Sequence, residues 1–148
     1  MRIWLLFLSL TTFVFAADGA APPRKLSLRL EQLSEASYRV ELIEGTSAVR
    51  YLHNPATFTT AKGTKEERIE IPPERWPVFW QHLEEAKAWA WKKNYRDKSV
   101  DETSLWHLRI DWDGRKLESS GVNAYPELEQ FSVYTAAVSE LLGGLKFE

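Results

Sequence analysis

The chain has 148 residues and a net charge of −2 at pH 7, because 19 lysines and arginines stand against 21 aspartates and glutamates. This near balance gives no electrostatic basis for binding nucleic acid or an anionic membrane surface. Cysteine is absent, which excludes disulfides, thiol catalysis and a lipid anchor on cysteine. The length is ordinary for one domain with one hydrophobic core.

The N-terminus has the three parts of a secretory signal peptide. Arg2 supplies the positive charge, residues 3–15 are almost wholly apolar, and the small residues Val14 and Ala16 precede the expected cleavage site. We therefore predict that residues 1–16 are removed. The alternative is an uncleaved membrane anchor, but the apolar run of about 14 residues is shorter than the roughly 20 needed to span a bilayer.

After cleavage, residues 17–24 are expected to form a flexible lead-in and residues 25–148 a single domain. No asparagine heads an Asn-x-Ser/Thr triplet, so the chain offers no N-glycan acceptor. An exported chain without cysteines or glycan acceptors favours a bacterial periplasmic or secreted protein. Stable membrane insertion after signal cleavage is not expected.

The first half of the domain is predicted to be an antiparallel meander. Apolar and polar residues alternate over 25–31, 37–42 and 48–53, the pattern of strands with one buried and one wet face. The polar stretch 54–66 indicates a surface loop, and residues 67–71 predict a short fourth strand.

A helix is predicted to follow directly. Its apolar residues fall at offsets 0, 3, 4, 7 and 14, which is one helical stripe: Trp76, Phe79, Trp80, Leu83 and Ala90. Two lysines at 92 and 93 suit the negative end of the helix dipole, so the helix is expected to end near them.

Residues 104–120 predict a hairpin around Asp113-Gly114, because both positions tolerate the positive φ of a tight hairpin turn. The expected register sets Trp112 opposite Arg115, Asp111 opposite Lys116, Ile110 opposite Leu117 and Arg109 opposite Glu118. One face of this hairpin is then apolar and the other carries opposite-charge pairs, and a slip of one residue would destroy both features.

A second helix is predicted to open at Pro126 and to end at Gly143-Gly144. Its expected stripe contains Leu128, Phe131, Thr135, Val138 and Leu142. The order β-β-β-β-α-β-β-α predicts an α+β fold, with an antiparallel sheet of about six strands and two helices packed on one face.

The histidines give only weak indications of chemistry. His82 and Glu85 are three apart on one predicted helix and would share a metal only if further ligands lay near. His107, on the outer face of the hairpin, and His53 are candidates for a surface base. Solvated surface positions explain all of these more simply, so no catalytic residue, metal or cofactor is predicted.

Tryptophan is the unusual component of the composition. The chain has seven, and six follow the signal peptide: Trp76, Trp80, Trp89, Trp91, Trp106 and Trp112. Trp76, Trp80 and Trp106 lie on predicted core faces. Trp89, Trp91 and Trp112, with Tyr95, are the candidates for a partly open aromatic surface, which would suit a sugar ring or a protein partner. The alternative is that these rings only add buried area.

A second candidate segment is Gly121-Val-Asn-Ala-Tyr-Pro126, in which Asn123 and Tyr125 precede the last helix. A rigid entry into that helix is the favoured interpretation, and both residues are also kept as binding candidates. With Trp91 and Tyr95 in a Trp-x3-Tyr segment, residues 76–142 resemble small exported bacterial proteins of unknown function. This chain has Asp101-Glu102-Thr103 where that resemblance implies Asp-Gly.

We therefore expect an exported, soluble binding or interaction module without catalytic activity, with a protein or glycan partner. The alternative is a small periplasmic hydrolase or glycan-processing enzyme that uses His107 or His82 with nearby carboxylates. Two histidines and a carboxylate in one cleft would favour the alternative.

Overall fold

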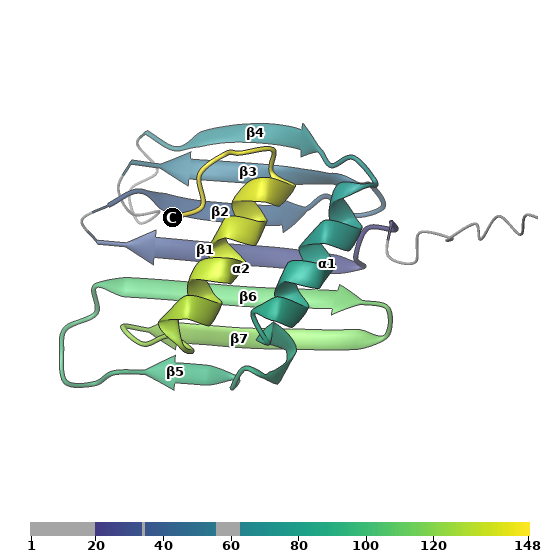
Figure 1. Cartoon of the computed structure of the whole chain (residues 1–148). Helices are drawn as coiled ribbons and strands as arrows, with labels where there is room; N and C mark the ends of the chain where they lie inside the picture. The colour runs from purple at the N-terminus through teal and green to yellow at the C-terminus, as the bar shows by residue number, and fades with distance from the viewer. Residues whose placement is uncertain (1–19, 34, 56–62) are drawn as a thin grey trace, which may run out of the picture.

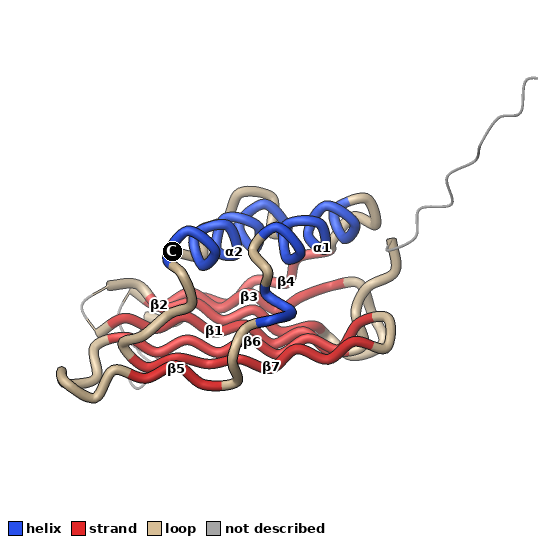
Figure 2. The backbone as a smooth tube through the Cα atoms, turned by 60° about the horizontal axis from the view of Figure 1, so that its bottom comes forward, coloured by secondary structure: helices blue, strands red, loops and turns tan. Residues whose placement is uncertain are grey.

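The computed structural model describes residues 20–33, 35–55 and 63–148. The predicted signal peptide, residues 17–19 of the lead-in and most of the predicted loop 54–66 lie outside the described residues. What is described is two layers, with a single sheet on one side and two helices on the other (Figures 1 and 2). The α+β class is therefore confirmed.

The sheet has seven strands in the order β4-β3-β2-β1-β6-β7-β5. The strands are β1 (Lys25–Gln32), β2 (Ser37–Leu42), β3 (Ala48–Asn54), β4 (Lys65–Glu70), β5 (Asn94–Arg96), β6 (Ser104–Trp112) and β7 (Arg115–Val122). All neighbours pair antiparallel except β5, which runs parallel to β7. The sheet thus has one strand more than the six or so that the sequence predicts.

The predicted hairpin is confirmed in every pair of its register, from Trp112 opposite Arg115 to Arg109 opposite Glu118. Asp113 and Gly114 have φ values of 48° and 72°, as the tight turn requires. Two predicted strand limits need correction. β3 ends at Asn54, and β4 begins at Lys65. Asn54 pairs with Ser37 of β2 and Lys65 pairs with His53 of β3, so strand pairing extends past the residues whose apolar alternation predicts the strands.

Helix α1 (Arg75–Glu85) ends about seven residues before the predicted limit, and a short 3-10 turn η1 (Ala88–Ala90) follows. Lys87 takes the left-handed conformation with φ 52°, which redirects the chain. The Trp91 indole then turns back and donates to the carbonyl of Ala86 at 3.1 Å. This bond satisfies a carbonyl that the helix end leaves without a partner.

Helix α2 (Leu128–Leu141) begins two residues later than predicted, and Leu128 is 75% exposed although the periodic stripe places it in the core. The rest of that stripe is buried. Both helices lie across the same face of the sheet (Figure 2), and the core forms between them and the alternate residues of β1, β2, β3, β6 and β7.

The chain after α2 completes the core over β2 and β3. Phe147 is fully buried, with its ring 6.1 Å from those of both Tyr38 and Tyr134. The Tyr51 hydroxyl donates to the carbonyl of Lys146 at 2.7 Å. The last residues therefore fix one border of the layer between the helices and the sheet, close to the end of β1 (Figure 1).

Candidate functional site

The aromatic candidates fall into two separate groups. Trp89 and Trp91 are two residues apart, yet their side chains diverge: Trp89 contacts Trp112 and Trp91 contacts Trp106. Trp112 and Trp106 stand six residues apart on β6, so the two groups lie at different places along the sheet. They do not form one continuous aromatic surface.

The first group lies at the tip of the hairpin. Trp112 stacks on the buried Trp80 with ring centroids 4.3 Å apart, and Trp89 lies 6.3 Å from Trp112 on the outer side. The guanidinium of Arg115 lies 3.9 Å from the Trp89 ring centroid and also pairs with Glu84. Trp89 and Trp112 are half-buried, and Arg115 occupies the face that a ligand ring would need.

The second group surrounds Trp106, which is 1% exposed. Rings of Trp91, Tyr95 and Tyr125 lie 5.9, 5.8 and 6.4 Å from its centroid. The polar atoms of these rings are engaged inside the protein: Trp91 donates to Ala86, Tyr95 accepts from a backbone N–H, and Tyr125 donates to Ser104. Trp91 is itself buried at 9% exposure, so this group mainly builds the core.

The segment that precedes α2 acts as a clip on this group. Asn123 has φ 53°, and its side-chain oxygen accepts from the backbone N–H groups of Thr103 and Ser104 at 2.9 and 3.0 Å. Its amide nitrogen donates to the carbonyl of Asp101 at 2.7 Å. Asn123 therefore holds the entry of β6, at the place where the sequence departs from the Asp-Gly that its resemblance implies.

The three histidines lie on three different surfaces. His53 is on the helix-covered side of the sheet, where its ring stacks on Tyr38 at 5.3 Å. His107 is on the opposite face, beside Arg29 of the neighbouring strand. His82 sits between the helices, with its ring nitrogens 2.9 Å from Glu85 and 3.1 Å from Glu140.

None of these histidines shares a cleft with another. Burial lowers the pKa of His107, Glu118 opposes that shift, and Arg109 and Arg29 add to it. The hydrogen bond from His82 lowers the pKa of Glu85. Because Glu85 and Glu140 contact different nitrogens of one ring, they do not converge on a common point. Among the described residues no group of three or more metal-ligating side chains is suited to hold an ion.

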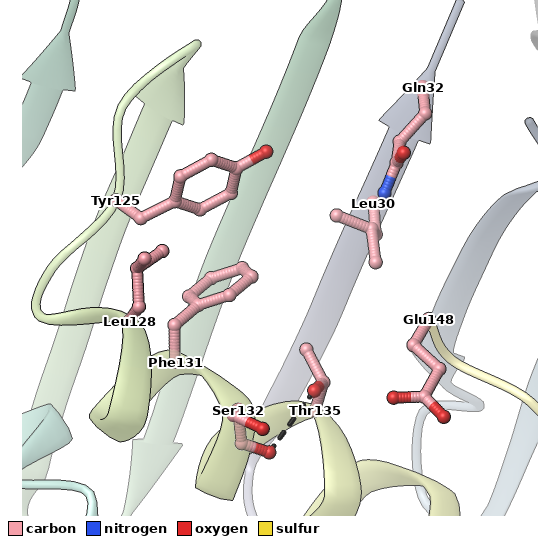
Figure 3. A pocket seen from close by; sticks show the side chains of 8 residues that line it. All are labelled: Leu30, Gln32, Tyr125, Leu128, Phe131, Ser132, Thr135 and Glu148. Atoms are coloured by element: carbon pink, nitrogen blue, oxygen red, sulfur yellow. Dashed lines mark hydrogen bonds between the residues drawn. The ribbon is translucent and has the colours of Figure 1, made fainter. Parts of the chain in front are cut away.

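The structure does contain a pocket beside one predicted residue, Tyr125. We call it the α2 pocket; it has a volume of about 250 Å³ and lies between the end of β1 and the first turns of α2 (Figure 3). Its lining residues are Leu30, Gln32, Tyr125, Leu128, Phe131, Ser132, Thr135 and Glu148. Figure 3 shows the apolar side chains of Tyr125, Leu128 and Phe131 on one side and Glu148 across the opening.

Local chemistry explains why this space stays open. The Tyr125 hydroxyl is tied to Ser104 at 2.8 Å, and its ring packs 4.8 Å from Phe131, so neither ring can swing into the pocket. Thr135 donates to the carbonyl of Ser132 at 3.2 Å, which keeps its hydroxyl on the helix. Contacts within the protein thus engage Tyr125, Phe131 and Thr135, while Leu128 is exposed at the rim.

The sequence alone points to only one of these lining residues, Tyr125. The one sequence feature that indicates the rest of the pocket is Leu128, an apolar residue that continues the core stripe of α2 but lies in the first turn of the helix. The apolar periodicity of the helix does not show whether a strand residue fills the space opposite Leu128. Here Leu30 and Gln32 of β1 leave it unfilled.

Comparison with known proteins adds no assignment: no protein-family model matches the chain, and no curated protein matches it. No helix in the described part of the chain is long and apolar enough to cross a membrane.

Proposed function

We propose that this protein is an exported, non-catalytic binding module and that its ligand places an apolar or aromatic group in the α2 pocket. The observation that carries the proposal is Leu128, which belongs to the apolar stripe of α2 and is nevertheless 75% exposed beside a pocket of about 250 Å³. Ligand sites are typically concave, mostly apolar and supplied with a few polar groups. The α2 pocket has this composition.

The separation of the three histidines supports the non-catalytic part of the proposal. A general base and its partner must lie within hydrogen-bond reach of one reacting position. His53, His82 and His107 lie on separate surfaces, and none of them lines the α2 pocket. The hydrolase alternative uses His107 or His82 with nearby carboxylates. His82 does lie between Glu85 and Glu140, but these carboxylates contact different ring nitrogens and no second histidine joins them.

Binding is tested with N-phenyl-1-naphthylamine, a neutral aromatic probe whose fluorescence rises in apolar surroundings. The purified protein should give a saturable increase. Leu128→Ser removes apolar contact that contributes about 1–2 kcal/mol to binding. The dissociation constant of the probe should therefore rise by about 5- to 30-fold. Ser132→Trp should block the pocket directly. Because both side chains are exposed, neither change should unfold the protein.

Val78→Ser is the matched control, since Val78 is an exposed aliphatic residue on the other helix and is 38% exposed. It should leave the titration unchanged. If Leu128→Ser and Ser132→Trp both bind the probe like the unmodified protein, the α2 pocket is not the binding site.

Export rests on the N-terminal sequence and has its own test. When the full chain is expressed in a bacterial host, the protein should be recovered outside the cytoplasm. N-terminal sequencing of that protein should give Ala17 as its first residue. An intact Met1 on cytoplasmic protein would refute export without bearing on the pocket.

A further inference from the structure

The end of the sheet beside the α2 pocket collects exposed apolar side chains. Register places the end of β1, the start of β6 and the end of β7 together there, and the start of α2 is joined to them by the Tyr125–Ser104 bond. Leu33, Val100 and Leu128, in the turns and the helix start at this end, are 62%, 56% and 75% exposed. They are three of the four large hydrophobic residues exposed in the described part of the chain.

The same end carries more acidic than basic side chains. Its turns, helix start and final residue contribute seven carboxylates: Glu35, Asp97, Asp101, Glu102, Glu127, Glu129 and Glu148. Four basic side chains of the described residues lie there as well: Arg96, Lys98, Lys65 at the start of β4 and Lys146 near the C-terminus. Seven carboxylates and four basic side chains give these residues a net charge of −3, so the surface at this end is predominantly acidic.

Only part of this negative charge is neutralised within the protein. Arg96 pairs with Glu102 at 2.7 Å. Asp97 accepts two hydrogen bonds from Ser99, and these lower the pKa of its carboxyl, so Asp97 stays ionised. Glu148 lies across the opening of the α2 pocket (Figure 3), and Glu127 and Glu129 flank Leu128 in the sequence.

From this arrangement we infer that the partner is a basic amphipathic peptide segment, with a leucine or phenylalanine that enters the α2 pocket and lysines or arginines that face the surrounding carboxylates. The inference rests on the proposed function and adds the partner's chemistry. Apolar contact supplies the anchor, and complementary charge selects the partner and accelerates its association. An acidic or neutral segment with the same apolar residues lacks the second contribution.

The test uses three synthetic peptides that share one leucine and phenylalanine pattern and differ only in their polar residues, which are lysine, glutamine or glutamate. Titration calorimetry at low salt should give tight binding for the lysine peptide, about tenfold weaker binding for the glutamine peptide and none for the glutamate peptide. Raising the salt from about 50 to about 300 mM should remove most of the difference between the first two, because exposed charges are then screened.

Charge-reversal variants locate the effect. The Glu127→Lys/Glu129→Lys variant should bind the lysine peptide about tenfold more weakly than the unmodified protein at low salt. The same variant should bind the neutral naphthylamine with an affinity within about twofold of the unmodified protein. The two lysines oppose the dipole of α2, so Glu35→Lys/Asp101→Lys, which leaves that helix unchanged, should give the same result. Glu44→Lys, at the β2–β3 turn on the opposite end of the sheet, controls for net charge and should change neither titration.

The outcomes separate the two proposals. Equal affinity for the lysine and glutamine peptides, or a normal titration after both double reversals, overturns the basic-partner inference and leaves the pocket function standing. Binding of the naphthylamine without binding of any peptide also overturns the inference. If neither the naphthylamine nor any of the peptides binds, both the proposed function and the basic-partner inference are overturned.

Discussion

Substitution of Gly121 by alanine is the perturbation for which the structure gives the most definite magnitude. Gly121 is opposite Trp106 in the β6–β7 pair. A Cβ atom built there would lie 2.1 Å from Trp106 Nε1 and 2.2 Å from the carbonyl oxygen of Ala124. Both distances are far below van der Waals contact. Because the second atom belongs to the backbone, β7 at Gly121 and the carbonyl of Ala124 cannot both keep their positions.

The indole cannot move aside without further loss. Trp106 is 1% exposed and packs against Phe131 at 5.1 Å, and its Nε1 donates to Ala124 at 2.9 Å. Overpacking of a core costs about 1–3 kcal/mol, and an indole N–H left buried without its acceptor costs about 1–3 kcal/mol more. We therefore expect Gly121→Ala to lower the free energy of unfolding by about 2–6 kcal/mol.

Urea unfolding followed by tryptophan fluorescence measures this loss, and a thermal melt should show a midpoint lower by about 3–5 °C for each kcal/mol. Gly45→Ala is the matched control, because Gly45 has φ 74° but nothing within 4 Å of its Cβ position. It should cost only about 1–2 kcal/mol of backbone strain.

A double-mutant cycle isolates the contact itself. Trp106→Phe removes the nitrogen that clashes, so the combined Gly121→Ala/Trp106→Phe variant should be more stable than the sum of the single losses predicts. A loss for Gly121→Ala no greater than that for Gly45→Ala, or strictly additive losses in the cycle, would refute the claim that Trp106 requires a glycine opposite it.

Three further predictions concern other parts of the molecule. Asn123→Ala should lower the free energy of unfolding by about 1–3 kcal/mol, measured by urea unfolding, since it removes the β6 clip and a residue suited to positive φ; Asn123→Asp, which keeps the accepting oxygen, should lose less, and equal losses would contradict the clip. Trp112→Ala should lower the thermal midpoint by removing a ring stacked on Trp80 but leave naphthylamine binding unchanged, whereas lost binding in a folded variant would return the site to the hairpin tip. The pKa of His107 is lowered in the folded state. As the pH falls below the ordinary value of 6.5, the unfolded chain therefore takes up the proton first, and the free energy of unfolding falls. In urea unfolding between about pH 7 and 5, His107→Gln should reduce the dependence of the free energy of unfolding on pH, and an equal dependence in the variant and the unmodified protein would contradict the contribution of His107.

Much of the fold is predictable because local rules agree with tertiary pairing. The hairpin register follows from Asp113-Gly114 and the alternation around it, since any slip would bury charge. The segregation of strands from helices follows from the change of apolar period from two to about 3.6. These features depend on residues that lie near one another in the sequence.

The parts that could not be predicted depend on contacts between distant residues. β5 has three residues, too few for a periodic pattern, and it exists because it pairs with the end of β7. Helix α1 ends without a glycine at the turn, since the Trp91 indole caps Ala86 from five residues downstream.

The candidate site shows the same division. Composition singles out the tryptophans, but only the topology decides that Trp89 joins the hairpin tip while Trp91 enters the core. The sequence predicts that Asn123 and Tyr125 make a rigid entry into α2, and their hydrogen bonds to the start of β6 fit that interpretation. The pocket beside Tyr125 depends on what β1 leaves unfilled, which no local pattern encodes.

The most direct test of the α2 pocket is a set of ¹⁵N–¹H correlation spectra recorded while the lysine peptide or the neutral naphthylamine is titrated into the labelled protein. Binding at the α2 pocket predicts saturable shifts of the amides of Leu30, Gln32, Leu128 and Ser132, with those at the hairpin tip unmoved. Shifts centred on Trp89 and Trp112, or no saturable shifts with either probe, would contradict the assignment of the binding site to the α2 pocket.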